Sequence, residues 1–245
     1  MTFKNFYEDD AYAGAYAKLE FPDTYYLAFR DLPVLFTKHV AGKRALDFGC
    51  GTGRSTRFLR KLGFETIGID VAEKMVQRAR ESDPTGEYRC ISDGDLDDFR
   101  DGTFDLVFSA FTFDNIPTRT HKVRLFTELA RVLAPTGRLV NVVSSPEIYL
   151  HEWASFSSKD FPENRQARCG DRVLIINTAL TDRRPVTDIL WPDADYRDVY
   201  SRAGLAVLEI HRPLGRPDEP YAWINETTIP PWTIYVLGKG GDSGP

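Results

Sequence analysis

The chain has 245 residues, with 31 Lys and Arg against 36 Asp and Glu, which gives a net charge of −5 at pH 7. This acidic balance argues against a nucleic acid as the main partner, because such binding needs a concentrated basic face. The three cysteines show no CxxC or Cys/His spacing, so neither a disulfide framework nor a zinc site is indicated. No run approaches the ~20 apolar residues of a membrane span, and the N-terminal stretch lacks the apolar core of a signal peptide. We therefore expect a soluble, cytoplasmic protein.

Residues 1–43 are rich in aromatic side chains with helical but irregular spacing, and we expect them to form a helical lid segment. Residues 44–143 alternate apolar runs of strand length with amphipathic helical stretches, which favours a parallel sheet covered on both faces. The predicted fold is therefore doubly wound α/β. Strands are predicted at Arg44–Phe48, Glu65–Ile69, Tyr88–Ile91, Phe104–Ser109 and Arg138–Val143, and helices at Ser55–Leu62, Ala72–Glu81 and Thr120–Leu133.

The alternation is interrupted over residues 144–192, where the strands Arg172–Ala179 and Val186–Trp191 are predicted to form a small inserted β-hairpin. We expect this insert to act as a lid or substrate segment. Residues 193–239 then return to the core and bring the mostly parallel sheet to seven strands, and residues 240–245 form a flexible tail. The predicted elements of this last part are the helix Tyr196–Ala203 and the strands Leu205–His211 and Thr233–Gly238.

The most informative stretch joins the first predicted strand to the first helix of the core. It reads Ala45-Leu46-Asp47-Phe48-Gly49-Cys50-Gly51-Thr52-Gly53-Arg54-Ser55, so the strand is followed by three glycines at alternate positions. Glycines there let a ligand press against the backbone, and the N-terminus of the next helix favours a polar or anionic group in the turn. The dinucleotide fingerprint GxGxxG would need a third glycine where Arg54 stands, which counts against NAD.

This pattern resembles the first motif of the class I S-adenosylmethionine-dependent methyltransferases. Later stretches resemble further motifs of that family in the right order, among them Gly68-Ile69-Asp70, Ser92-Asp93-Gly94-Asp95 and the run from Leu129 to Leu139. The resemblance implies a Rossmann-like fold and S-adenosylmethionine as cofactor, with S-adenosylhomocysteine as its product. The implied cofactor contacts are Asp47, Gly49, Gly51 and Gly53 in the turn, Asp70 on the ribose hydroxyls, Val71 on the adenine, Asp93 with Gly94 near the adenine amino group, and Phe111 in the pocket wall. A surface turn at Asp93 and a plain core role for Phe111 are the alternatives.

Few residues are candidates for a general base that takes a proton from the acceptor. Many small-molecule members of the family carry a Glu-His pair after the fourth strand, where this chain has Asp114-Asn115, and Asn115 cannot act as a base at neutral pH. The resemblance places Tyr7 and Tyr16 near the cofactor, and His151 follows the fifth strand in the expected lid. We name these three residues as the catalytic candidates, with ordinary structural roles as the alternative.

We interpret the chain as a methyltransferase that acts on a nitrogen of a small, heteroaromatic acceptor. The layout of the whole chain is similar to that of toxoflavin-type azapteridine N-methyltransferases. Oxygen methylation of a secondary metabolite or quinone precursor is one alternative, and a non-catalytic cofactor-binding protein or an NAD-dependent oxidoreductase is the alternative from another class. We expect no metal, nucleic acid or membrane partner, and a monomer or homodimer. Aromatic side chains outside the core favour a flat acceptor as a set: Tyr7, Tyr12, Tyr16, Tyr25, Tyr26, Trp153, Trp191, Trp223 and Trp232.

Overall fold

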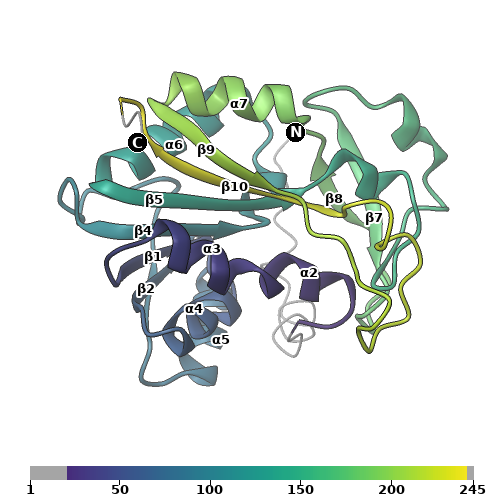
Figure 1. Ribbon diagram of the computed structural model, residues 1–245, viewed down its shortest axis with the longest axis horizontal. Helices are drawn as coiled ribbons and strands as arrows, with labels where there is room; N and C mark the ends of the chain where they lie inside the picture. Colours follow the sequence, from purple (N-terminus) through teal and green to yellow (C-terminus); the bar gives the residue numbers. More distant parts are fainter. Residues whose placement is uncertain (1–20, 242–245) are drawn as a thin grey trace.

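A seven-stranded sheet forms the centre of the computed structural model, which describes residues 21–241 (Figure 1). The strand order is β3-β2-β1-β4-β5-β10-β9. Neighbours from β3 to β5 are parallel, whereas β10 pairs antiparallel with both β5 and β9. The expected α/β fold with a mostly parallel seven-stranded sheet is thereby confirmed. The strands are β1 (Arg44–Phe48), β2 (Glu65–Asp70), β3 (Glu87–Cys90), β4 (Phe104–Ala110), β5 (Leu133–Ser144), β9 (Leu205–His211) and β10 (Trp232–Lys239).

Helices cover both faces of this sheet, because its central strands are apolar on both sides. On β4, Phe108 packs with the core that includes the first helices, while Val107 packs with the core that includes α6 and α7. Helices α4 and α5 lie on the face opposite α6 and α7 (Figure 1). The helices are α2 (Thr24–Arg30), α3 (Leu32–His39), α4 (Arg54–Lys61), α5 (Glu73–Ser82), α6 (Arg119–Val132) and α7 (Asp193–Arg202).

The element bounds follow the sequence pattern closely, with the largest difference at β5. This strand begins at Leu133 rather than Arg138, directly after helix α6. Leu133 already pairs with Phe104, and the register then shifts before Leu106 meets Arg138. The stretch that the sequence leaves between helix and strand is therefore an irregular first part of β5.

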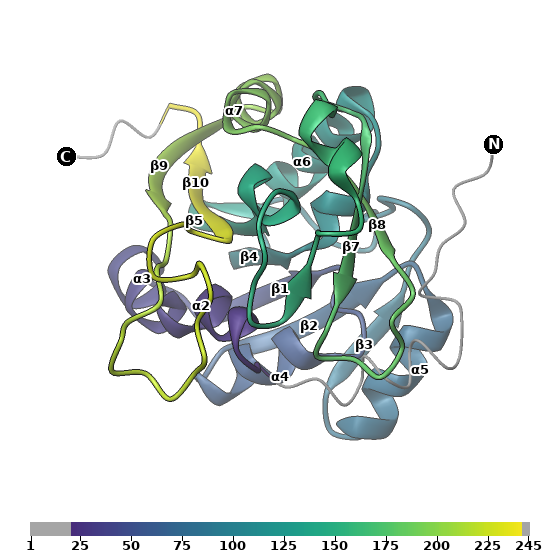
Figure 2. The same ribbon diagram turned by 90° about the vertical axis from the view of Figure 1, so that its right-hand side faces the viewer.

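The insert between β5 and α7 builds a second, smaller sheet at the carboxyl end of the central strands. Strand β7 (Arg172–Asn177) pairs antiparallel with β8 (Val186–Ile189) where the sequence predicts a hairpin, and β6 (Phe156–Ser157) adds a third strand. Figure 2 faces this end of the molecule, and β7 and β8 lie in front of the central sheet. The insert therefore covers the edge where doubly wound sheets bind ligands.

The N-terminal segment is helical in its described part, where α2 and α3 pack on the sheet. Tyr7 and Tyr16 lie outside the described residues, so their proposed roles stay predictions. Within residues 21–241, no helix combines the length and the apolar character needed to cross a bilayer.

Candidate functional site

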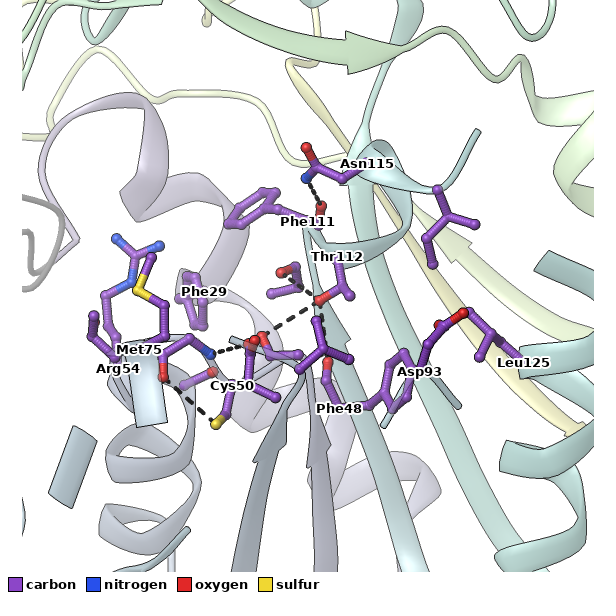
Figure 3. Close-up of a pocket in the computed structure, with 18 residues that line it drawn as sticks. Phe29, Phe48, Cys50, Arg54, Met75, Asp93, Phe111, Thr112, Asn115 and Leu125 are labelled. Atoms are coloured by element: carbon purple, nitrogen blue, oxygen red, sulfur yellow. Dashed lines mark hydrogen bonds between the residues drawn. The ribbon is translucent and has the colours of Figure 1, made fainter. Parts of the chain in front are cut away.

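A cavity of about 250 Å³ lies at the carboxyl ends of β1, β2 and β4 (Figure 3). Strand β1 has β2 on one side and β4 on the other, so this is the point where the chain order of the sheet reverses. Such switch points are the usual ligand sites of doubly wound sheets. Of the predicted cofactor residues, the cavity is lined by Gly49, Gly51, Asp70, Val71, Asp93 and Phe111.

The glycine turn between β1 and α4 forms one wall of this cavity. All three of its glycines have positive φ, at 74° for Gly49, 52° for Gly51 and 81° for Gly53. A Cβ on Gly49 would lie 2.0 Å from the Thr112 hydroxyl oxygen, and one on Gly53 would lie 2.7 Å from the hydroxyl of Tyr88. A Cβ on Gly51 would meet no protein atom within 4 Å. Two glycines are thus required by the fold itself, whereas Gly51 leaves open space beside the cavity.

Asp70, at the end of β2, is held in place by the backbone around it. Its Oδ2 accepts from the Gly51 N–H at 2.8 Å and its Oδ1 from the Ala72 N–H at 2.9 Å. Burial raises the pKa of Asp70, and these backbone donors act against that shift. A carboxylate has about four lone-pair positions, so Asp70 can accept two further hydrogen bonds from a ligand in the cavity.

Asp47 lies beneath the turn rather than in the cavity wall. Its Oδ2 accepts from the hydroxyls of Ser55 and Thr56, both at 2.6 Å, and so anchors the first turn of α4. Its Oδ1 is buried without a hydrogen-bond partner among the described residues. Burial raises the pKa of Asp47 to about 6. Like Asp47, Gly53 is not among the residues that line the cavity.

Asp93 stands at the outer edge of the cavity, opposite Arg54 in the view of Figure 3. Its carboxylate is largely exposed and lies 2.9 Å from His121 Nε2 and 3.0 Å from Arg124 Nη2. The neighbouring Gly94 lies outside the lining, and a Cβ there would lie 2.4 Å from a Leu125 side-chain carbon.

His151 lies outside both cavities described for this end of the sheet. It is half-buried, its Nε2 is 3.1 Å from Glu147 Oε2, and its ring meets Trp153 edge-on. The structure therefore places His151 apart from the predicted cofactor residues. Its role in proton handling stays a prediction.

Arg54 is a cavity residue that the sequence singles out only as a missing glycine. It is largely buried, and its guanidinium carbon lies 5.3, 4.8 and 5.7 Å from the ring centres of Phe21, Tyr25 and Phe29. These rings come from α2 and the residues before it, so the cation–π contacts depend on tertiary packing. Arg54 places a positive charge beside the N-terminus of α4.

A second, smaller chamber of about 50 Å³ lies next to the first cavity, and Phe111 and Asn115 line both. Phe111 has a φ of 64°, a conformation that non-glycine residues adopt at an energetic cost and that is often found at functional sites. Aromatic and acidic side chains both line the chamber. The lining includes Tyr25, Asp114, Ser144, Tyr149, Phe156, Asn177, Asp188 and Trp232.

The two acids that line this chamber, Asp114 and Asp188, belong to a buried group of ionisable residues. Asp188 Oδ2 accepts from the Tyr149 hydroxyl at 3.0 Å, and Asp114 accepts from the Ser144 N–H at 3.0 Å. Lys122 is fully buried on α6 and donates to the carbonyl of Phe113. Burial raises the pKa of Asp188 to about 8 and of Asp114 to about 6, and lowers the pKa of Lys122 to about 7.

Sequence reasoning did not find this group, because its members stand in different elements. From the sequence, Asp114 is named only because it stands where related proteins have a Glu-His pair. Asp188 lies far from it in the sequence, on β8 of the insert. The one sequence signal was the lysine on the apolar side of α6: Lys122 precedes Leu125 and Phe126 by three and four residues, which is the spacing of one helix face. Within residues 21–241, no three His, Cys, Asp or Glu side chains are placed to hold a metal ion.

The fold and the cavity beyond the glycine turn define a protein with a nucleoside-type ligand site at the switch point of a doubly wound sheet. Residues 46–141 match the family model described as a methyltransferase domain. An S-adenosylmethionine-dependent methyltransferase structure from Clostridium acetobutylicum has a TM-score of 0.63 at 14% identity, covering 97% of this chain and 100% of that one. Residues 46–141 are therefore similar to a methyltransferase domain, and the fold around them is one that S-adenosylmethionine-dependent methyltransferases share.

Two relatives match different amounts of the chain. The ubiquinone biosynthesis O-methyltransferase of Methylococcus capsulatus is 36% identical over 96 residues, which are 38% of this chain and 40% of that protein. The N-demethylindolmycin N-methyltransferase of Streptomyces griseus is 26% identical over 202 residues, which are 81% of this chain and 84% of that protein. The chain therefore matches about two fifths of the quinone-pathway relative and most of the N-methyltransferase.

Proposed function

We propose that this protein uses S-adenosylmethionine to methylate a nitrogen of a small, flat heteroaromatic metabolite. The observation that supports it best is the pair of adjacent cavities at the carboxyl ends of the strands. One is bounded by the glycine turn and Asp70, the other by aromatic rings and buried acids, and Phe111 and Asn115 stand between them. A two-substrate transfer needs such adjacent sites, since much of its rate comes from holding the reactants together.

The residues around the larger cavity suit S-adenosylmethionine. Asp70 would accept from the ribose hydroxyls, Gly51 would let the cofactor approach the backbone, and Arg54 would offer a cation to the carboxylate of its amino-acid part. When bound, the cofactor supplies a methyl group activated on a sulfonium. The aromatic rings of Phe29 and Phe111 would border the site and exclude water.

The choice of nitrogen rests on how far each relative matches. The match to the O-methyltransferase covers 38% of this chain, whereas the match to the N-methyltransferase covers 81% and so must include residues outside 46–141. Most residues that line the smaller chamber, including those on β8 and β10, lie outside residues 46–141. These are the residues that would contact an acceptor.

Calorimetry of the full chain with S-adenosylhomocysteine and with NAD tests the cofactor. We expect micromolar binding of the former and none of the latter, and the opposite result would refute the proposal. Transfer of a labelled methyl group to a panel of N-heteroaromatic and phenolic compounds then tests the acceptor atom. Label found only on oxygen would replace nitrogen methylation by the O-methyltransferase alternative, and cofactor binding without transfer to any compound would favour the non-catalytic alternative.

A further inference from the structure

The smaller chamber has a wall of three aromatic rings that come from three separate elements. Tyr25 on α2 and Trp232 on β10 stack with ring centres 5.9 Å apart and planes 23° apart. Phe156 on β6 meets Trp232 edge-on at 5.7 Å. Side chains packed against one another in this way lose little freedom when a ring binds beside them. The wall therefore offers a preformed surface for the flat face or edge of an aromatic ligand.

Asp188 lines the same chamber and offers a hydrogen-bonding position that no described residue fills. Asp188 is only 9% exposed, and Tyr149 occupies its Oδ2. Its Oδ1 makes no hydrogen bond with any residue in the described part of the chain, although Asp188 lines the chamber. A largely buried carboxylate is stabilised by each hydrogen bond that it accepts, so a ligand that brings an N–H to Oδ1 is favoured.

Burial is the main cause of the raised pKa of Asp188, and the groups around it act in both directions. Asp114 raises this pKa further through like charge, whereas the hydrogen bond from Tyr149 and the charge of Lys122 lower it. Among residues 21–241 no ion pair joins Lys122 to either carboxylate, and its Nζ lies 4.7 Å from the Trp191 ring centre instead. No cation therefore occupies the position that Asp188 leaves open.

On the basis of the proposed function, we propose that this chamber is the acceptor subsite and that Asp188 selects acceptors whose inserted edge carries an N–H group. The class is a planar N-heteroaromatic with a pyrrole-type N–H, held by its hydrogen bond to Asp188 Oδ1. With about 50 Å³ available, and about 30 Å³ for one water in the liquid, the chamber admits one edge of such a ring system. When Asp188 is deprotonated, acceptors that present only a pyridine-type lone pair give its Oδ1 no donor.

Replacing Asp188 by Asn should reverse this preference. The amide oxygen can keep the hydrogen bond from Tyr149, which turns the amide N–H₂ toward the chamber. The site then donates where it formerly accepted. Because a buried polar mismatch is costly, the relative affinity for donor and acceptor ligands should change by about tenfold or more.

The test uses the full chain saturated with S-adenosylhomocysteine, and two bicyclic probes measured by ligand-detected NMR at pH 8.5. Indole carries only an N–H donor, and isoquinoline carries only a lone pair. We expect the wild-type protein to prefer indole, and Asp188→Asn to lower the indole-to-isoquinoline affinity ratio about tenfold. Asp182→Asn, in the turn between β7 and β8, is the matched control and should leave the ratio unchanged.

A pH series on the wild-type protein tests the same assignment without a variant. Since deprotonation of Asp188 and of Lys122 both make the chamber more negative, indole affinity should rise from pH 6.5 to 8.5. An unchanged ratio in Asp188→Asn, a pH-independent indole affinity, or no binding of either probe would overturn the acceptor assignment. Failure of S-adenosylhomocysteine to bind is a separate result, which would refute the proposed function.

Discussion

Gly51 offers the sharpest test of the cofactor cavity, because its role can be separated from that of the fold. It has a φ of 52° and lines the cavity, and a Cβ there would meet no protein atom within 4 Å. Gly63 is a matched control, with a φ of 88° and equally open space, but outside this cavity. Placing Ala in the left-handed region costs about 1–2 kcal/mol, so both Gly51→Ala and Gly63→Ala should lose that much unfolding free energy.

Only Gly51→Ala should also lose ligand. A methyl group inserted into a packed contact costs about 1–3 kcal/mol, which corresponds to a roughly 5- to 150-fold weaker S-adenosylhomocysteine affinity. Urea unfolding gives the stability of both variants, and calorimetry gives the affinity. If Gly51→Ala binds S-adenosylhomocysteine as tightly as Gly63→Ala does, the ligand does not approach the turn and the reasoning from its open space is refuted.

Three further predictions concern charged residues. Asp70→Asn should weaken S-adenosylhomocysteine binding by about 1–3 kcal/mol, measured by calorimetry, and unchanged affinity in a folded variant would remove Asp70 from the site. Arg54→Met should weaken S-adenosylhomocysteine more than 5′-methylthioadenosine, which lacks the carboxylate, and an equal loss for both would refute the assigned contact. Burial raises the pKa of Asp188 to about 8, so between about pH 4 and pH 8 the folded state holds a proton that the unfolded state has lost. The free energy of unfolding of the wild-type protein should therefore fall as the pH rises through that window. Urea unfolding at pH 5.5 and 7.5 measures this fall, which should be smaller in Asp188→Asn than in the wild-type protein. An equal fall in both would contradict the assignment.

The parts of the fold that could be predicted from sequence are those with local causes. The strand and helix bounds between 44 and 143 follow from hydrophobic period, and the glycine turn follows from its position between a buried strand and a helix. The resemblance to methyltransferase motifs predicts Asp70 in the site, and the structure places it at the end of β2, where it lines the cavity. Asp47 was predicted to contact the cofactor on the same motif, but it does not line the cavity. The hydroxyls of Ser55 and Thr56 hold its carboxylate under the turn instead.

The smaller chamber could not be predicted, because its walls depend on contacts between residues distant in sequence. Tyr25 and Asn177 are joined by a hydrogen bond across 152 positions, and Asp188 and Tyr149 by one across 39. Neither pair leaves a periodic or spaced signal in the chain. Composition indicated that aromatic side chains gather outside the core, but not which of them share a wall.

The buried acids are informative because they are poor ways to stabilise a protein. Apolar residues of similar volume commonly replace buried charged groups at no cost or with a gain in stability, and Asp188 could give way to Leu within a sheet already rich in apolar side chains. Its burial raises its pKa to about 8, which means that the fold disfavours the charged form of this acid. Asp188 accepts a hydrogen bond from only one described side chain, Tyr149. Structural need accounts for the aromatic wall, which packs well in any case. It does not account for an acid that lines a chamber beside the proposed cofactor cavity, whereas the proposed recognition of an N–H group does.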